Sequence, residues 1–81
     1  MNSWMGWTRK LDPPIALRKR RRLSTLTEAR TLMESLPLGS QSSPYWQYAK
    51  ALVDDAAEHD ESNMVEVRAQ LYRALRAEGL I

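Results

Sequence analysis

Five consecutive basic residues are the strongest chemical feature of this sequence. They are Arg18, Lys19, Arg20, Arg21 and Arg22. Each Lys or Arg that neutralises a phosphate releases a counterion, so such a cluster can bind a nucleic-acid backbone. The same cluster can also keep a strand edge from pairing, or lie on acidic helices of its own chain. Because no groove-reading motif accompanies it, the sequence favours the second interpretation.

Two tryptophans lie near this cluster in the sequence. Trp4 and Trp7 can act as an N-terminal aromatic anchor that stacks on unpaired bases. With Arg9 and Lys10 they can also sit at a membrane interface, although so few apolar residues make this the weakest interpretation. The alternative is that they fold onto the core of the domain or contact a partner.

The remaining polar residues predict no catalytic site. His59 is the single histidine, and one imidazole with the nearby Asp55 and Asp60 is a poor ligand set for a metal ion. His59 instead suits the C-terminal end of a helix, where its cation meets the helix dipole favourably. The acidic residues around it fall on predicted polar faces, and no nucleophile motif accompanies the hydroxyls. We expect a protein that is not an enzyme and that uses no metal or cofactor.

Three amphipathic helices are expected to position these residues, over the ranges 26–36, 44–59 and 64–78. Each begins with a capping pair: Thr25 with Glu28, Ser43 with Pro44, and Asn63 with Glu66. Pro37 ends the first helix, and a flexible polar loop is expected over 38–42. Gly79 is the expected left-handed stop of the third helix, with Leu80 packing back on Leu75.

Apolar residues at helical spacing predict one core. Those expected to be largely buried are Leu26, Ala29, Met33, Leu36, Leu52, Val53, Ala56, Val67, Leu71 and Leu75. Tyr45 is expected to begin the buried stripe of the second helix. Trp46 and Tyr48 are assigned to core and rim.

A second surface follows the third helix, beside its core stripe. It consists of Val65, Ala69, Tyr72 and Arg76. Tyr and Arg commonly anchor interfaces, so this surface is a candidate contact for a partner or for a second copy of the chain. The alternative is a wide core stripe in which Tyr72 is half buried. The sequence leaves both interpretations open.

The chain divides into an N-terminal tail over residues 1–12 and a single small helical domain over residues 13–81. Pro13 and Pro14 impose an extended backbone, which predicts an extended segment or a short β-hairpin before the helices. No Asn-Gly or Asp-Gly follows to make a tight turn. The expected fold is mainly α (small α+β), with this segment followed by three helices around one core.

Composition and charge narrow the class of protein. The 81 residues are 43% hydrophobic and 27% charged and include no cysteine, so disulfides and thiolate metal sites are excluded. Residues 1–24 carry a net charge of +6 and residues 25–81 one of −4, which describes a basic arm on an acidic body. No apolar run approaches the ~20 residues that span a bilayer, and the N-terminus does not resemble a signal peptide. We therefore expect a cytoplasmic protein.

The order of caps and stops resembles a family of small alphaproteobacterial proteins, domain-of-unknown-function family 982. The matching positions are Pro14-Ile15, Ser24-Thr25, Glu28-Ala29, Leu36-Pro37, Tyr45 or Tyr48 with Ala49, and Ala74 to Gly79. Leu36 stands where that family usually has Trp, and the basic run replaces a glycine-containing turn. The resemblance implies a small α+β fold and brings no established activity.

These observations favour a non-enzymatic protein–protein interaction module that self-associates. The alternative is a nucleic-acid-binding accessory protein that uses the basic arm at residues 18–22. A membrane-spanning protein is not expected.

Overall fold

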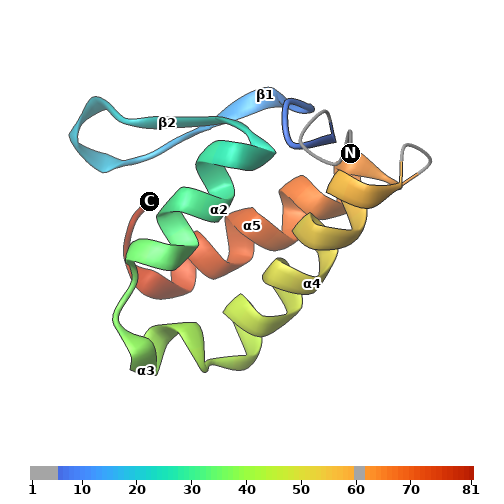
Figure 1. The fold of residues 1–81 in the computed structure, drawn as a ribbon. Coiled ribbons are helices and arrows are strands. Elements are labelled where there is room, and N and C mark those ends of the chain that lie inside the picture. The colour runs from blue at the N-terminus through green and yellow to red at the C-terminus, as the bar shows by residue number, and fades with distance from the viewer. Residues whose placement is uncertain (1–5, 60–61) are drawn as a thin grey trace.

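The computed structural model of the protein describes residues 6–59 and 62–81. A two-stranded antiparallel hairpin lies along one side of a group of helices (Figure 1). In chain order the elements are β1 (Lys10–Ala16), a turn (Arg18–Arg20), β2 (Arg22–Thr25), α2 (Leu26–Ser35), α3 (Leu38–Gln41), α4 (Pro44–Glu58) and α5 (Met64–Glu78). The predicted mainly α, small α+β fold is confirmed, with a short helix, α3, added to the three that the sequence predicts.

Of the two alternatives for the segment before the helices, the structure has the hairpin. Ile15 lies opposite Leu23, and the register shifts between Lys10 and Ile15. The shift falls where Pro13 and Pro14 have no N–H to donate to the strand pairing. Because β1 begins at Lys10, residues 10–12, which we assigned to the tail, form part of the folded domain.

The predicted caps hold the starts of the three long helices. Side chains accept hydrogen bonds from backbone N–H groups in each case: Thr25 from Glu28 at 3.2 Å, Ser43 from Trp46 at 3.4 Å, and Asn63 from Val65 at 3.0 Å. Gly79, with φ of 83°, ends α5 in the left-handed conformation. The N–H of Leu80 donates to the carbonyl of Leu75 at 2.9 Å, which confirms the Schellman motif.

The prediction of a flexible loop over residues 38–42 is wrong, because Leu38–Gln41 forms the short helix α3. Side-chain contacts hold this short helix in place. The Ser40 hydroxyl donates to Glu78 Oε2 at 2.7 Å, and Gln41 Nε2 donates to the Leu36 carbonyl at 2.7 Å. Glu78 Oε1 accepts from Trp46 Nε1 at 3.1 Å, so one carboxylate joins α3, α4 and α5. No local sequence rule predicts a contact that spans 38 residues.

Most residues of the predicted core are buried in the structure. Leu36 and Leu52 are only partly buried, whereas the other eight residues of the predicted core are buried. The prediction that Tyr45 begins the buried stripe of α4 is wrong, because Tyr45 is 52% exposed. Trp46, which is 2% exposed, begins the stripe instead. The difference is confined to the first turn of the helix, because Ala49, Val53 and Ala56 of the predicted stripe are buried as expected. The tyrosine hydroxyl remains in water, and the larger indole fills the core.

The hairpin closes the core on the side of α2 and α5. Leu11, Ile15 and Leu23 are each at most 3% exposed, and they pack in the same cluster as the helix residues. Arg68 Nε of α5 also donates to the carbonyl of Pro13 at 2.6 Å. The hairpin is thus a fixed part of the domain.

Replacing Leu71 with alanine should destabilise the protein by about 2–5 kcal/mol, because it removes buried methyl groups and leaves a cavity. Leu71 has no exposed surface. The measurement is the free energy of unfolding from urea denaturation. The matched control is Leu38→Ala, which alters a side chain that is 80% exposed and should leave stability nearly unchanged. Equal effects of the two substitutions would show that the described core is not the one that stabilises the domain.

Candidate functional site

The basic residues form the tip of the hairpin. Lys19 has φ of 60° and ψ of 34°, and Arg20 has φ of 62°. Two central residues with positive φ are the geometry of a type I′ turn, which normally requires Asn or Gly. The N–H of Arg21 donates to the carbonyl of Arg18 at 3.4 Å across this turn. The chain therefore makes a tight hairpin without the Asn-Gly signal, at a cost of about 1–2 kcal/mol for each left-handed side chain.

Neighbouring backbone groups fix this turn on the domain. The N–H of Leu17 donates to the carbonyl of Arg21 at 2.8 Å, and that of Arg18 donates to the carbonyl of Leu80 at 3.0 Å. The second bond ties the turn to the segment after α5. Packing and backbone hydrogen bonds thus stabilise a conformation that the local sequence does not favour.

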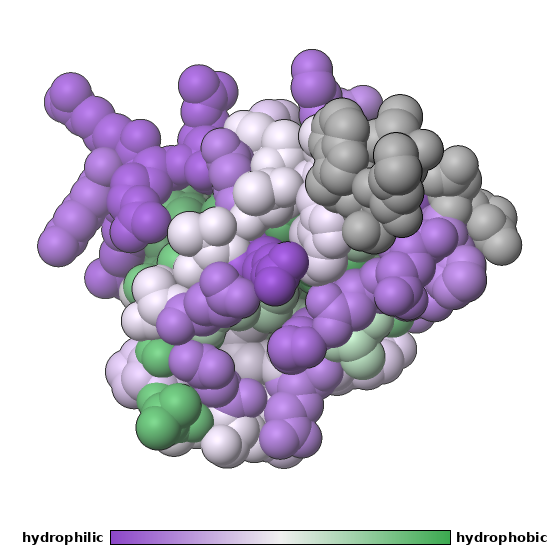
Figure 2. Space-filling model, in the orientation of Figure 1, coloured by the Kyte–Doolittle hydropathy of each residue, from purple (hydrophilic) through white to green (hydrophobic). Residues whose placement is uncertain are grey.

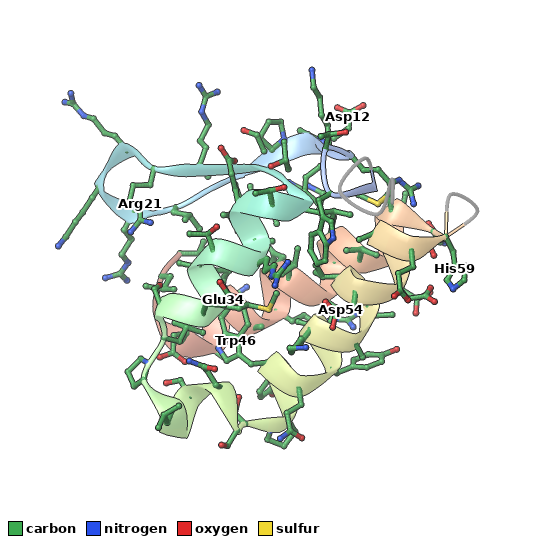
Figure 3. All side chains as sticks on the ribbon, in the orientation of Figure 1. Asp12, Arg21, Glu34, Trp46, Asp54 and His59 are labelled. Atoms are coloured by element: carbon green, nitrogen blue, oxygen red, sulfur yellow. The ribbon has the colours of Figure 1, made fainter. Side chains whose placement is uncertain are left out.

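All five basic side chains are exposed. Arg21 lies at the end of the hairpin (Figure 3), where hydrophilic side chains project from the surface (Figure 2). Among the described residues, none of the five forms an ion pair with a carboxylate. Arg18 to Arg21 are the four residues of the type I′ turn, and only Arg22 lies within a strand. Over the described residues the structure therefore shows no ion pair between this arm and the acidic helices, and it places only Arg22 of the five along a strand.

The basic turn and Trp7 do not come together. Trp4 lies outside the described residues, and Trp7 precedes β1, whose seven residues separate it from the turn by about 20 Å. Trp7 is partly buried, and the Arg30 guanidinium lies 5.1 Å from its ring centroid, a cation–π contact. Of the alternatives that the sequence leaves open for this tryptophan, the structure has the one in which it packs on the domain.

Arg9, the basic residue next to Trp7, caps the C-terminal end of α4. Its Nη1 donates to the carbonyls of Ala56 and His59, each at 2.9 Å, and its Nη2 donates to that of Ser62 at 3.2 Å. A cation at this position also interacts favourably with the helix dipole. The guanidinium of Arg9 is thus engaged in hydrogen bonds within the domain.

The second candidate surface is the outer face of α5, formed by Val65, Ala69, Tyr72 and Arg76. Val65 is 77% exposed and Tyr72 is 39% exposed, and Arg76 is also exposed. Their spacing of four, three and four residues places all four within about 60° of the helix circumference. The structure therefore places the four residues on one strip, in which Ala69 is half-buried and Tyr72 is less exposed than Val65.

Two oppositely charged residues flank this face, and two further tyrosines lie near it. Glu66 and Arg73 are both exposed on the side of α5 that faces α4. Glu66 Oε1 accepts a hydrogen bond from the Tyr48 hydroxyl at 3.4 Å, which connects the flank to α4. Tyr45 and Tyr48 are about half exposed. Apolar area and both signs of charge thus occur together on the α4–α5 side of the molecule.

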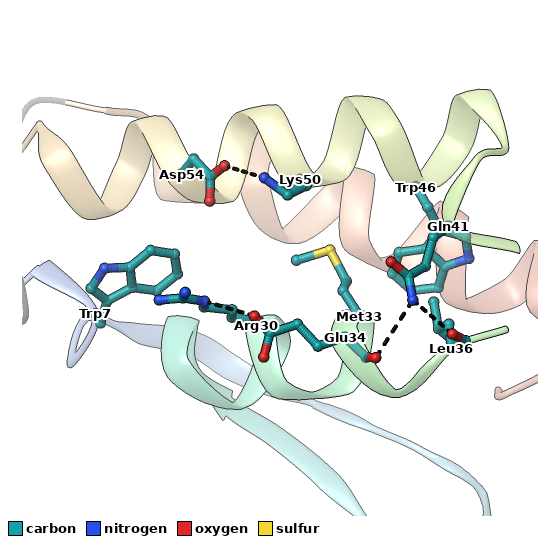
Figure 4. A pocket seen from close by; sticks show the side chains of 9 residues that line it. All are labelled: Trp7, Arg30, Met33, Glu34, Leu36, Gln41, Trp46, Lys50 and Asp54. Atoms are coloured by element: carbon teal, nitrogen blue, oxygen red, sulfur yellow. Dashed lines mark hydrogen bonds and ion pairs between the residues drawn. The ribbon is translucent and has the colours of Figure 1, made fainter. Parts of the chain in front are cut away.

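A groove of about 350 Å³ lies between α2 and α4 (Figure 4). Met33 and the buried Trp46 contribute apolar lining, and Trp7 lies at one end. Each of the two helices contributes an ion pair: Arg30 with Glu34 at 3.2 Å, and Lys50 with Asp54 at 2.8 Å. Arg30, Glu34 and Lys50 are largely exposed and Asp54 is half-buried, and in each pair both partners belong to the same helix. The sequence reasoning missed this groove, although both pairs are visible as charges four residues apart.

The polar lining of the groove consists of charged side chains and one glutamine. Its carboxylates are paired with cations in the same helix, and it contains no Ser, Thr or His. Over residues 6–59 and 62–81, no group of three His, Asp or Glu side chains is placed to share a metal ion. His59 lies at the end of α4 with Nε2 3.7 Å from Asp55 Oδ1, an exposed contact, and Asp60 lies outside the described residues.

Comparisons with known proteins give no match to a protein-family model, a curated protein or a solved structure. The resemblance to domain-of-unknown-function family 982 therefore remains a hypothesis based on caps, stops and core positions. Across the described residues, no helix has both the length and the apolar composition that a bilayer crossing requires. The function must be argued from the surfaces themselves.

The strained turn predicts an unusual effect of glycine. Arg20→Gly should stabilise the protein by about 1 kcal/mol, because glycine adopts positive φ without steric cost. The control is Arg21→Gly, which removes the same charge at a position where φ is −92° and should be neutral or destabilising. Chemical denaturation of both variants gives the comparison. A destabilising effect of Arg20→Gly would show that Arg20 does not hold a left-handed conformation.

Proposed function

We propose that this protein is a non-enzymatic, cytoplasmic protein–protein interaction module that self-associates through the outer face of α5. The observation that carries the proposal is the exposure of Val65 and Tyr72 on one strip of a helix whose opposite side is buried in the core. Exposed apolar and aromatic groups gathered on one helix are typical of interfaces.

The spacing of the strip suits a two-fold interface. Read from either end, the intervals between Val65, Ala69, Tyr72 and Arg76 are the same, so two antiparallel copies of α5 can pack about the midpoint of the strip. Ala69 then lies opposite Tyr72 of the second copy, and Val65 lies opposite the aliphatic stem of Arg76. A small residue facing a large one allows close packing of the two helices, and the arrangement is self-complementary, as a two-fold dimer requires.

The flanking charges are complementary in the same arrangement. Glu66 and Arg73 lie on one flank of α5, and in an antiparallel pair the same flanks face each other. Glu66 of one copy is then displaced along the axis from Arg73 of the other by about two residues, or about 3 Å. Each dimer therefore brings two pairs of opposite charges together, which fixes the register more than it adds affinity. Such a helix pair buries less than the standard ~1,600 Å², so we expect a dimer that dissociates on dilution.

A charge-exchange experiment tests this interface. Glu66→Arg and Arg73→Glu should each weaken self-association, because like charges then face each other across the dimer. The double exchange should restore it. Sedimentation velocity over a concentration series measures the dimer fraction, and circular dichroism confirms that each variant is folded.

The control for these variants is Tyr48→Phe, which removes the hydrogen bond to Glu66 without changing charge and should leave the dimer intact. A wild-type protein that stays monomeric at the highest concentrations would refute the proposal. So would single exchanges that dimerise as well as the wild type.

A further inference from the structure

The strongest feature that self-association leaves unexplained is the basic turn. It combines four exposed cations, a backbone conformation that disfavours the side chains of two of them, Lys19 and Arg20, and the absence of an ion pair among the described residues. Glycine or asparagine would be better tolerated at Lys19 and Arg20. The strained positions nevertheless carry charge, and strain of this kind occurs most often at functional sites.

We propose that this turn binds the backbone phosphates of double-stranded DNA by entering the major groove. The β1–β2 hairpin is a two-stranded ribbon, and the major groove of B-form DNA, about 12 Å wide, admits such a ribbon. Side chains at the tip then reach the phosphates on both sides of the groove. The deep, narrow major groove of duplex RNA excludes them.

The surroundings of the turn favour a duplex over a single strand. Proteins that bind single strands stack the bases on aromatic side chains. The described aromatic residues nearest in sequence are Trp7, at the far end of β1, and Tyr45 of α4, and neither belongs to the hairpin. The turn therefore offers charge without a stacking surface, which gives phosphate contacts and little sequence selectivity.

The distribution of charge orients the molecule on DNA. The turn and the acidic end of α4, represented by Arg21 and Asp54, lie on different sides of the molecule (Figure 3). Residues 25–81 carry a net charge of −4, so the body is repelled by phosphates while the turn is attracted. Approach with the turn first is the favoured orientation.

Binding of this kind has a defined dependence on salt. Each phosphate contact contributes about 0.9 to the slope of log affinity against log salt concentration. Four contacts from residues 18–21 predict a slope of about −3.6, so raising the salt from about 50 to 200 mM weakens binding on the order of a hundredfold.

The test uses the double variant Lys19→Asn, Arg20→Gly, which places the sequence of a favourable type I′ turn at the tip. This variant removes two cations and relaxes the backbone, so a loss of binding cannot be ascribed to unfolding. Fluorescence anisotropy with a labelled DNA duplex should show weaker binding and a salt slope reduced by roughly two units. The control is the double variant Arg30→Gln, Lys50→Gln, which removes the same number of positive charges from the groove between α2 and α4. This variant should keep the salt slope of the wild type.

Three further probes distinguish the ligand. A duplex RNA and a single-stranded DNA of the same sequence should bind more weakly than duplex DNA, and vesicles of anionic phospholipid should not compete. The proposal is overturned if wild-type protein fails to bind duplex DNA at low salt, if the turn variant binds as well as the wild type, or if RNA or vesicles bind as tightly. The comparison between the wild type and the turn variant holds for a monomer or a dimer, so its outcome is independent of self-association through α5.

Discussion

Burial of the hairpin against the helices is the interaction on which the rest of the structure depends. A chain of this length buries only about 60% of its unfolded surface, and an isolated two-stranded hairpin is barely stable in water. The hairpin and the helices stabilise each other through the buried side chains of Leu11, Ile15 and Leu23. Each of these side chains contributes about 1.5–3 kcal/mol to the stability of the domain, and together they cover the core between α2 and α5. The same contacts fix the direction of the turn, so core packing positions a surface feature.

The two proposed binding surfaces lie on different elements and use different physics. The outer face of α5 offers apolar area with a few flanking charges, whereas the turn offers charge alone. The two surfaces depend on different parts of the fold. The outer face of α5 needs only a straight helix whose opposite side is buried. The turn needs the pairing of β1 with β2 and the hydrogen bond from Arg18 to Leu80. A dimer formed through α5 would carry two turns related by its two-fold axis, which raises the local concentration of cations for a long polyanion.

Local signals predicted much of this fold, and tertiary contacts decided the rest. The helices begin and end close to the expected residues because Thr25, Ser43, Asn63 and Gly79 act on their immediate neighbours. The sequence could not predict the type I′ turn, since no local rule favours Lys19 at positive φ; packing and long-range hydrogen bonds impose it.

The same division holds for the candidate sites. The exposed run at 18–22 and the strip on α5 were found from residue types and spacing. The groove between α2 and α4 was not found, because its walls come from separate helices. The exposure of Tyr45 and the burial of Trp46 depend on how the first turn of α4 packs. A one-residue error in a stripe is enough to move an aromatic side chain from surface to core.

The contacts between the hairpin and α5 also have a consequence for how the chain is made. Pro13 accepts from Arg68, and Arg18 donates to Leu80, so partners far apart in the order of synthesis meet in the folded domain. On the ribosome, β1 must wait until α5 has been translated. Contacts of such long sequence separation form slowly, and Leu11 and Ile15 remain uncovered in the meantime. Until α5 has emerged, the nascent chain therefore exposes two apolar side chains that the folded domain buries completely.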